Sequence, residues 1–219
     1  MRIATWNVER LKHKARLEEI VKTCNSPNAD ILVLTETDNR IQPEYRYCFS
    51  TPALHEIRPD FYDPTENRVS IFTNYELIRR YETYDEYTSI CVGLNTPYGE
   101  VIVYGTIIGI YGNRHPSFSQ DLEGQMADLS RLSALHDGIC FCGDFNCSFS
   151  DNYYFTNAGR EKILATLNSS SVSILTKEQK ECIDHIAVSN MLVQGKQVCV
   201  EEWNADKDLS DHKGIVVDF

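Results

Sequence analysis

The stretch GICFCGDFN, residues 138–146, combines a continuous apolar run with an abrupt polar end. An unbroken apolar run of this length is typical of a strand that is buried on both faces. The polar end carries a carboxylate, Asp144, and an amide, Asn146. Because side chains at strand ends can converge on one rim of a layered enzyme, this stretch predicts both a sheet-based fold and the place of a site.

Two stretches nearer the N-terminus have the same design. RIATWN, residues 2–7, is an apolar-rich run that closes with Asn7, and DILVLTE, residues 30–36, is a continuous apolar run that closes with Glu36. We therefore expect two further buried strands whose polar ends contribute an amide and a carboxylate to the same rim.

The C-terminal part of the chain supplies three more polar residues. Asp211 and His212 come just before the apolar run GIVVDF, residues 214–219, so an antiparallel neighbour would deliver them to the rim. Asp184 lies inside CIDHIAVS, residues 182–189, where a charge among apolar residues is costly unless it is paired or bound to a metal. Asp184 therefore needs a partner.

The rest of the chain alternates between strand and helix patterns. Helical spacing of apolar residues predicts one helix near residues 17–24, one over 117–135 that starts with a capping box of Ser117 and Gln120, and one over 158–167. Short apolar runs between turn signals predict strands at 46–50, 69–73, 75–84, 88–94 and 100–112. Strands outnumber helices but the helices are long, so we expect an α+β fold with helices on the outer faces of two sheets.

Length and composition indicate a soluble globular protein. The chain has 219 residues, of which 42% are hydrophobic and 24% charged, and we expect a single domain over residues 1–219. No apolar run approaches the roughly 18 residues of a membrane-spanning helix, and MRIATWNVER lacks the apolar core of a signal peptide. We expect a cytoplasmic location, no membrane contact and reduced cysteines, because eight scattered cysteines are too few for a disulfide scaffold.

The net charge of -11 argues against a protein that wraps nucleic acid by general attraction, because phosphate contacts usually come from a basic surface. It does not exclude a nuclease, since a metal site is itself a cluster of carboxylates and its cation can invert the local field. Arg10, Lys12, Lys14 and Arg68 lie near the expected rim and could receive substrate phosphates, although such side chains are usually solvated.

The polar residues at the strand ends form a chemically coherent set. Hard oxygen ligands favour Mg²⁺ or Mn²⁺, which neutralise phosphate charge and lower the pKa of bound water. A histidine beside a carboxylate can be cationic and stabilise charge on a phosphate. The set therefore predicts hydrolysis of a phosphate ester by four acids, two amides and one histidine: Glu36, Asp144, Asp184, Asp211, Asn7, Asn146 and His212.

Five short motifs carry a resemblance to a known family. WNV (6–8), LTET (34–37), GDFN (143–146), IDHI (183–186) and LSDH (209–212) occur in this order over nearly the whole chain, which resembles the endonuclease/exonuclease/phosphatase superfamily. The resemblance implies a four-layer α/β/β/α sandwich, in which two mixed, mostly antiparallel sheets pack face to face. It also implies cleavage of phosphate esters, as by exonuclease III or pancreatic deoxyribonuclease.

The resemblance also implies a role for each matching residue. Glu36 would be the main metal ligand, with Asn7 and Asp211 in the shell around metal and phosphate. Asp144 would orient or deprotonate the attacking water, and Asn146 would hold Asp144 or the phosphate. Asp184 and His212 would form a carboxylate–histidine pair that touches the phosphate.

The chain departs from the family pattern in its central strand. That strand often ends with a His or Tyr that contacts the phosphate, whereas here the matching position carries Thr106, with Tyr104 two residues earlier on the same face. Tyr104 itself, or Arg114 or His115 in GNRHP, would have to substitute. Otherwise turnover would be slower than in related proteins.

Three functions remain open at this point. The first is a nuclease, either an endonuclease or an exonuclease, that acts on DNA or RNA. The second is a phosphatase or phosphodiesterase for a small soluble phosphoester, which the acidic charge favours. The third is a catalytically silent binding protein on the same fold. No obligate protein partner is expected for any of them.

Overall fold

Apolar strands form the centre of the molecule, and the computed structural model describes all residues 1–219. The first sheet contains β1 (Arg2–Asn7), β2 (Ile31–Asp38), β3 (Tyr47–Ser50), β4 (Glu66–Thr73), β11 (Cys199–Trp203) and β12 (Gly214–Asp218). The second sheet contains β5 (Glu76–Tyr81), β6 (Ser89–Thr96), β7 (Gly99–Ile107), β8 (Ile139–Asp144), β9 (Val172–Ile174) and β10 (Asp184–Ser189).

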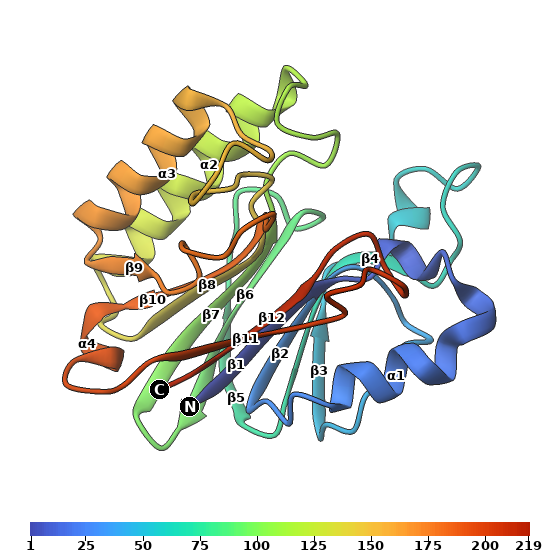
Figure 1. Cartoon of the computed structure of the whole chain (residues 1–219), viewed down its shortest axis with the longest axis horizontal. Coiled ribbons are helices and arrows are strands. Elements are labelled where there is room, and N and C mark those ends of the chain that lie inside the picture. The colour runs from blue at the N-terminus through green and yellow to red at the C-terminus, as the bar shows by residue number, and fades with distance from the viewer.

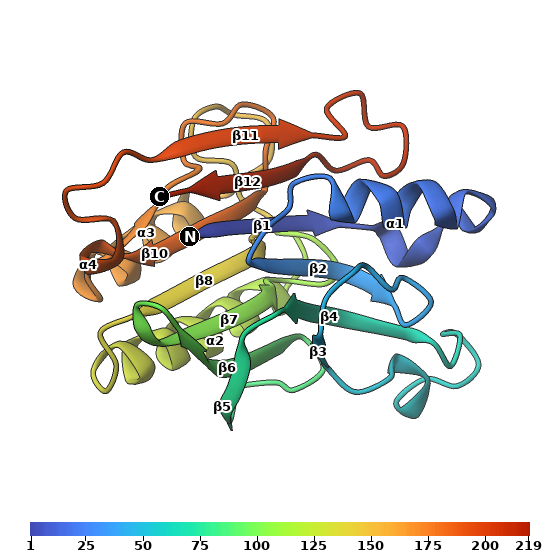
Figure 2. The ribbon, with the colours of Figure 1, turned by 90° about the horizontal axis from the view of Figure 1, so that it is seen from below.

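The two six-stranded sheets have related topologies. Their strand orders are β11-β12-β1-β2-β4-β3, which Figure 2 shows for the first sheet, and β5-β6-β7-β8-β10-β9. Each sheet has one parallel pair near its centre, β1 with β2 and β7 with β8, and all its other pairs are antiparallel. The prediction of two mixed, mostly antiparallel sheets is confirmed.

Three apolar layers hold the sheets and helices together. The inner faces of the sheets meet through side chains such as Val33 and Ile71 from the first sheet and Val103 and Cys142 from the second. Their alternation along each strand follows from the two-residue period of a β-strand. Each such fully buried side chain contributes about 1.5–3 kcal/mol relative to its exposed state. This shared core fixes the two sheets against each other.

Helices cover the two outer faces, as Figure 1 shows. On the first sheet lie α1 (Leu17–Asn25), which packs by Ile20 and Cys24, and the short 3-10 turns η1 (Glu9–Leu11), η2 (Lys14–Arg16) and η3 (Leu54–Glu56). On the second sheet lie α2 (Ser117–Ser133) and α3 (Asn157–Ser169), while the one-turn α4 (Asn190–Val193) follows β10. The expected four-layer α/β/β/α sandwich is therefore confirmed.

Some local predictions were wrong. The helix α2 has Pro116 at its N-cap and no side-chain cap, because the Ser117 hydroxyl instead hydrogen-bonds His115 Nδ1 at 2.8 Å. The central strand ends at Ile107 rather than continuing to residue 112, since the chain leaves the sheet there. The short strands β9 and β11 were not predicted. No helix in the structure is both long and apolar enough to cross a lipid bilayer.

Candidate active site

Strand register brings the first two polar residues to one edge of the first sheet. Asn7 is the last residue of β1 and pairs with Thr35 of the parallel strand β2, so Glu36 follows directly at the same edge. The Asn7 side chain reaches across to the second sheet, where its Nδ2 donates a hydrogen bond of 3.2 Å to Asp144 Oδ2. The two sheets are therefore joined by polar groups at this rim.

In the second sheet, two carboxylates face each other across one pair of strands. Asp144 ends β8 and pairs with Asp184, the first residue of the antiparallel strand β10. On its other side β8 pairs with β7, and Gly143 is needed there: its φ is +134°, and a Cβ would lie 2.0 Å from the Thr106 carbonyl oxygen. The glycine of the GDFN motif is therefore required by the backbone that presents Asp144.

The predicted carboxylate–histidine pair is present. His212 Nδ1 lies 2.5 Å from Asp184 Oδ2; the Asp184 side chain is buried, and that of His212 is 16% exposed. The main chain of His212 is held as well, because its carbonyl oxygen accepts hydrogen bonds from Trp6 Nε1 and Asn204 Nδ2. Burial alone would lower the pKa of His212, but the charge of Asp184 and their hydrogen bond raise it to about 10. His212 is therefore cationic at neutral pH.

Asp144 is fixed by donors on both of its oxygens. Asn7 donates to Oδ2, and the Asn146 backbone N–H donates to Oδ1 at 2.8 Å. Burial, followed by the negative charge of Asp184, raises the pKa of Asp144 to about 7. A carboxylate of this kind can gain or lose a proton near neutral pH, as a general base requires.

The amide of Asn146 is used to hold the neighbouring loop. Its Nδ2 donates to the carbonyl oxygens of Ile108 and Gly109, and the main-chain carbonyl oxygen of Asn146 accepts from Asn113 Nδ2 at 2.8 Å. Asn113 is buried and its Oδ1 has no partner. The sequence analysis missed Asn113, and only its place after the predicted central strand could have suggested it.

Asn7, Asp144, Asp184 and His212 form what we call the polar group. Asp211 and Glu9 lie at its margin. The Asp211 side chain is 70% exposed, with Oδ1 3.6 Å from His212 Nε2, and its backbone N–H donates to Glu9 Oε2 at 3.0 Å. Glu9 also donates its own backbone N–H to Asn7 Oδ1. Sequence reasoning overlooked this second carboxylate, although its position directly after the WNV motif was a usable signal.

Backbone strain is concentrated at the same rim. Ten non-glycine residues have positive φ, and five of them lie here: Glu9, Arg10, Leu11, Glu36 and Asn146, with φ between 44° and 53°. Each such conformation costs on the order of 1–3 kcal/mol and persists only where surrounding contacts impose it. This clustering supports a functional role for the rim.

The carboxylate and amide oxygens at this rim are suited to a hard divalent cation that takes few protein ligands. No three His, Cys, Asp or Glu side chains lie close enough to form a metal cluster alone. Mg²⁺ does not need such a cluster, because it is usually bound by one or two carboxylates together with waters and substrate phosphate. Asp184 Oδ1 is buried without any hydrogen-bond partner, which indicates that the site still has capacity for a cation or a donor.

The four predicted substrate-binding residues do not join the polar group. Tyr104 is fully buried and donates to Asp128 Oδ2 of α2 at 2.8 Å, and Thr106 donates to Gln125 Oε1 of α2 at 2.6 Å. Both side chains therefore face the outer helix layer. Arg114 and His115 line a separate hollow beside α2 and α3.

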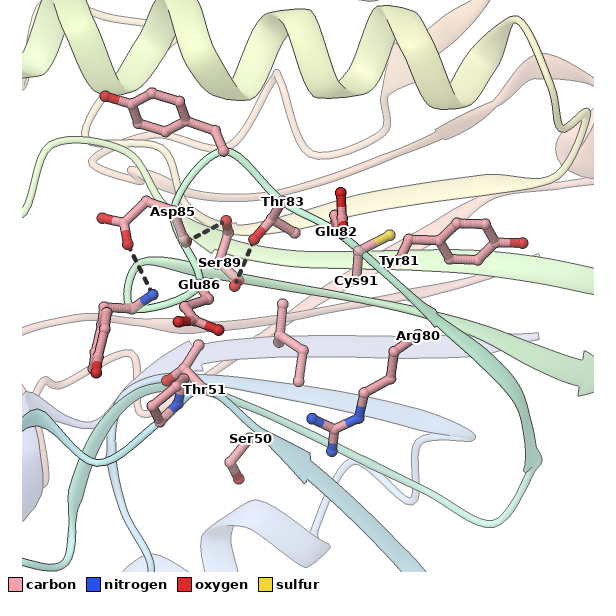
Figure 3. Close-up of a pocket in the computed structure, with 14 residues that line it drawn as sticks. Ser50, Thr51, Arg80, Tyr81, Glu82, Thr83, Asp85, Glu86, Ser89 and Cys91 are labelled. Atoms are coloured by element: carbon pink, nitrogen blue, oxygen red, sulfur yellow. Dashed lines mark hydrogen bonds between the residues drawn. The ribbon is translucent and has the colours of Figure 1, made fainter. Parts of the chain in front are cut away.

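Hollows flank the polar group on two sides. One of about 260 Å³ includes Asp184, His212, Tyr153 and Lys207, and one of about 560 Å³ includes Glu36 and Arg10. A larger hollow, of about 780 Å³, lies between the end of β3 and the loop from β5 to β6, as Figure 3 shows. It contains no residue of the polar group.

One family model matches nearly the whole of the chain. The family model described as Endonuclease/Exonuclease/phosphatase family matches residues 4–212. No curated protein matches the sequence. A solved structure of 3' phosphatase NExo from Neisseria, bound to a product DNA hairpin, is 18% identical with a TM-score of 0.72, and covers 100% of this chain and 99% of that one.

Two further solved structures have the same fold. An AP endonuclease from Archaeoglobus fulgidus is 16% identical with a TM-score of 0.71, covering 100% of this chain and 99% of the other. A variant of beta toxin from Staphylococcus aureus with bound magnesium ions is 16% identical with a TM-score of 0.67, covering 99% of this chain and 98% of the other.

Proposed function

Because the chain belongs to the endonuclease/exonuclease/phosphatase family, whose model spans residues 4–212, we propose that it is a divalent-metal-dependent phosphodiesterase that cleaves nucleic acid. The observation that carries this proposal is the joining of Asn7 and Asp144 across the two sheets, beside the hydrogen-bonded pair of Asp184 and His212. These residues come from distant parts of the chain, and their convergence into one polar group is what a hydrolytic site needs.

Each of these residues has a chemical task in the proposal. Asp144, whose pKa of about 7 suits proton transfer, accepts the proton of the attacking water, and Asn7 and Asn146 hold its two oxygens in place. His212, kept cationic by Asp184, stabilises negative charge on the phosphate. Mg²⁺ or Mn²⁺ bound at Glu36, near Asn7 and Asp211, would supply phosphate neutralisation and an activated water.

Cationic side chains lie on both sides of the polar group, and this arrangement favours a linear polyanion as the substrate. Lys207 and Lys213 line the hollow next to His212, and Arg10 lines the hollow next to Glu36. Tyr153 and Tyr154 line the first of these hollows and offer faces on which a base could stack. The DNA hairpin named for the structure from Neisseria, and the AP endonuclease, support the same substrate class.

The test is cleavage of labelled oligonucleotides with Mg²⁺. The panel contains single-stranded and duplex DNA, an abasic duplex, a 3'-phosphorylated strand and RNA, each with an EDTA control. We expect Glu36→Gln and His212→Ala to lower kcat/KM by at least about 100-fold, as loss of a group acting in the transition state does. The matched control is His136→Ala, since His136 lies beyond the far end of α2. Equal activity in wild type, Glu36→Gln and His212→Ala would mean that this group is not the active site.

A second candidate is a phosphatase or phosphodiesterase for small soluble phosphoesters. The net charge of -11 favours it, as do the lysines near the site that are already paired: Lys12 with Glu9, Lys14 with Asp63 and Lys213 with Glu202. Nucleotides and inositol phosphates belong in the same assay. A preference for them with little dependence on salt would select this candidate, because binding along a nucleic acid weakens steeply as salt rises. Absence of metal-dependent turnover on every substrate would leave the silent binding protein.

A further inference from the structure

The hollow beside Glu36 contains three cationic side chains, and one differs from the other two. Lys12 is paired with Glu9 at 3.1 Å, and Lys14 is paired with Asp63 at 2.7 Å. Both lysine side chains therefore already have a carboxylate partner at close distance. Arg10 lines the same hollow and has no partner at such a distance.

Arg10 lies between two carboxylates without forming a hydrogen bond to either. Its Nε is 3.8 Å from Glu36 Oε2 and its Nη1 is 3.7 Å from Glu66 Oε2. Both distances are too long for a hydrogen bond. The guanidinium also lies over the rings of Phe61 and Tyr62, at 5.7 and 5.5 Å from their centroids. Charge and ring contacts hold it, and its donors stay free.

Glu66 depends on this arginine. The Glu66 side chain is only 10% exposed, and its Oε2 is buried without a hydrogen-bond partner. An uncompensated buried carboxylate is costly, so the nearby guanidinium supplies the compensation. A divalent ion at Glu36 would supply the same positive charge to this corner of the site.

The backbone imposes the position of Arg10. Glu9, Arg10 and Leu11 are three successive residues in the left-handed region, and Leu11 is anchored in the core under α1. The Glu9 backbone N–H is held by Asn7 Oδ1 at 2.9 Å. The strained turn therefore ties Arg10 directly to the strand that carries Asn7.

We propose that Arg10 is a displaceable counter-ion of the metal site. Its guanidinium compensates Glu36 and Glu66 when no divalent ion is bound, and it moves away when Glu36 binds the ion. This inference rests on the proposed function, because it takes Glu36 as a metal ligand. It implies that the wild-type protein binds divalent ions more weakly than its carboxylates would allow, since each binding event displaces a positive charge.

The test measures Mn²⁺ binding directly, by the electron paramagnetic resonance signal of free Mn²⁺, in wild type, Arg10→Met, Lys12→Met and Glu36→Gln. Removing a positive charge about 4 Å from a ligand oxygen should tighten Mn²⁺ binding by about tenfold in Arg10→Met. Lys12→Met is the matched control, because Lys12 is 68% exposed and already paired with Glu9, and it should change the affinity less than threefold. Far-UV circular dichroism checks that each variant is folded.

The outcomes separate this inference from the proposed function. If wild type binds no Mn²⁺, or Glu36→Gln binds it as tightly as wild type does, the metal site and the counter-ion role both fail. If Glu36→Gln abolishes binding while Arg10→Met stays within twofold of wild type, or binds more weakly, the counter-ion role alone is overturned. It is also overturned if Lys12→Met tightens binding as much as Arg10→Met does.

Discussion

Protonation of one buried histidine should make the protein sensitive to mild acid. His185 follows Asp184 in β10 and is fully buried. Its Nε2 lies 3.0 Å from the Cys147 carbonyl oxygen, which can only accept, so Nε2 carries the proton. Its Nδ1 lies 2.9 Å from the Thr176 hydroxyl, which can donate to it. These two contacts satisfy both nitrogens of the neutral ring, and a second proton would place a full charge in a fully buried position.

The size of the effect follows from the pKa of His185. Burial lowers it from 6.5 to about 4. Since the folded pKa is depressed, the stabilisation is fully present above pH 6.5 and is lost as the pH falls toward 4. Each pKa unit corresponds to about 1.4 kcal/mol, so the complete loss is about 3 kcal/mol, and about 2 kcal/mol of it should be lost by pH 5.

The measurement compares wild type with His185→Gln, a neutral side chain whose amide can still donate to Cys147. Urea unfolding followed by tryptophan fluorescence gives the free energy of unfolding of each protein at pH 7 and pH 5. Other groups titrate in both proteins and cancel in the difference between them. We expect that difference to shift by about 2 kcal/mol in favour of the variant at pH 5. A difference that is the same at both pH values would refute a neutral, proton-resisting His185.

Two further predictions concern the backbone. Gly143→Ala should lower the free energy of unfolding by about 3 kcal/mol or more, measured by urea unfolding, because the new Cβ would meet the Thr106 carbonyl oxygen at 2.0 Å; a loss under about 1 kcal/mol would contradict this. Thr156→Ala should cost about 1 kcal/mol, because the Thr156 hydroxyl caps α3 by accepting from Gly159 N–H at 3.1 Å. Ser117→Ala is the matched control. It should change the free energy of unfolding by less than about 0.5 kcal/mol, because the Ser117 side chain does not cap α2. Equal losses in Thr156→Ala and Ser117→Ala would contradict this prediction.

The strand framework was predictable because its strongest signals are local. An unbroken apolar run that ends in a carboxylate or amide indicates a buried strand and one end of it. Asp144 is the last residue of β8, as its run predicted, whereas β2 continues two residues past Glu36 to Asp38. The family resemblance added the pairing of the sheets, which no single run contains. The predicted partner of Asp184 followed from the cost of burying an unpaired charge, and His212 is that partner.

What could not be predicted depends on contacts between layers. Tyr104 and Thr106 share a face of β7, as their spacing predicted, but whether this face meets the rim or α2 depends on which helix covers the sheet. Periodicity gives the alternation of faces and not the identity of the neighbour. The capping box at Ser117 failed for a similar reason, because His115 competes for the same hydroxyl.

The pairing of individual side chains explains how an acidic protein can bind a phosphate substrate. Two of the cations next to the proposed reaction centre are accompanied by carboxylates, His212 by Asp184 and Arg10 by Glu36 and Glu66. Without a divalent ion these clusters present little net positive charge to a phosphate. A bound ion adds two positive charges and, in the counter-ion proposal, releases Arg10 from its carboxylates. Affinity for substrate would then depend on metal binding itself, and an acidic protein would need no basic surface to hold a phosphate at this rim.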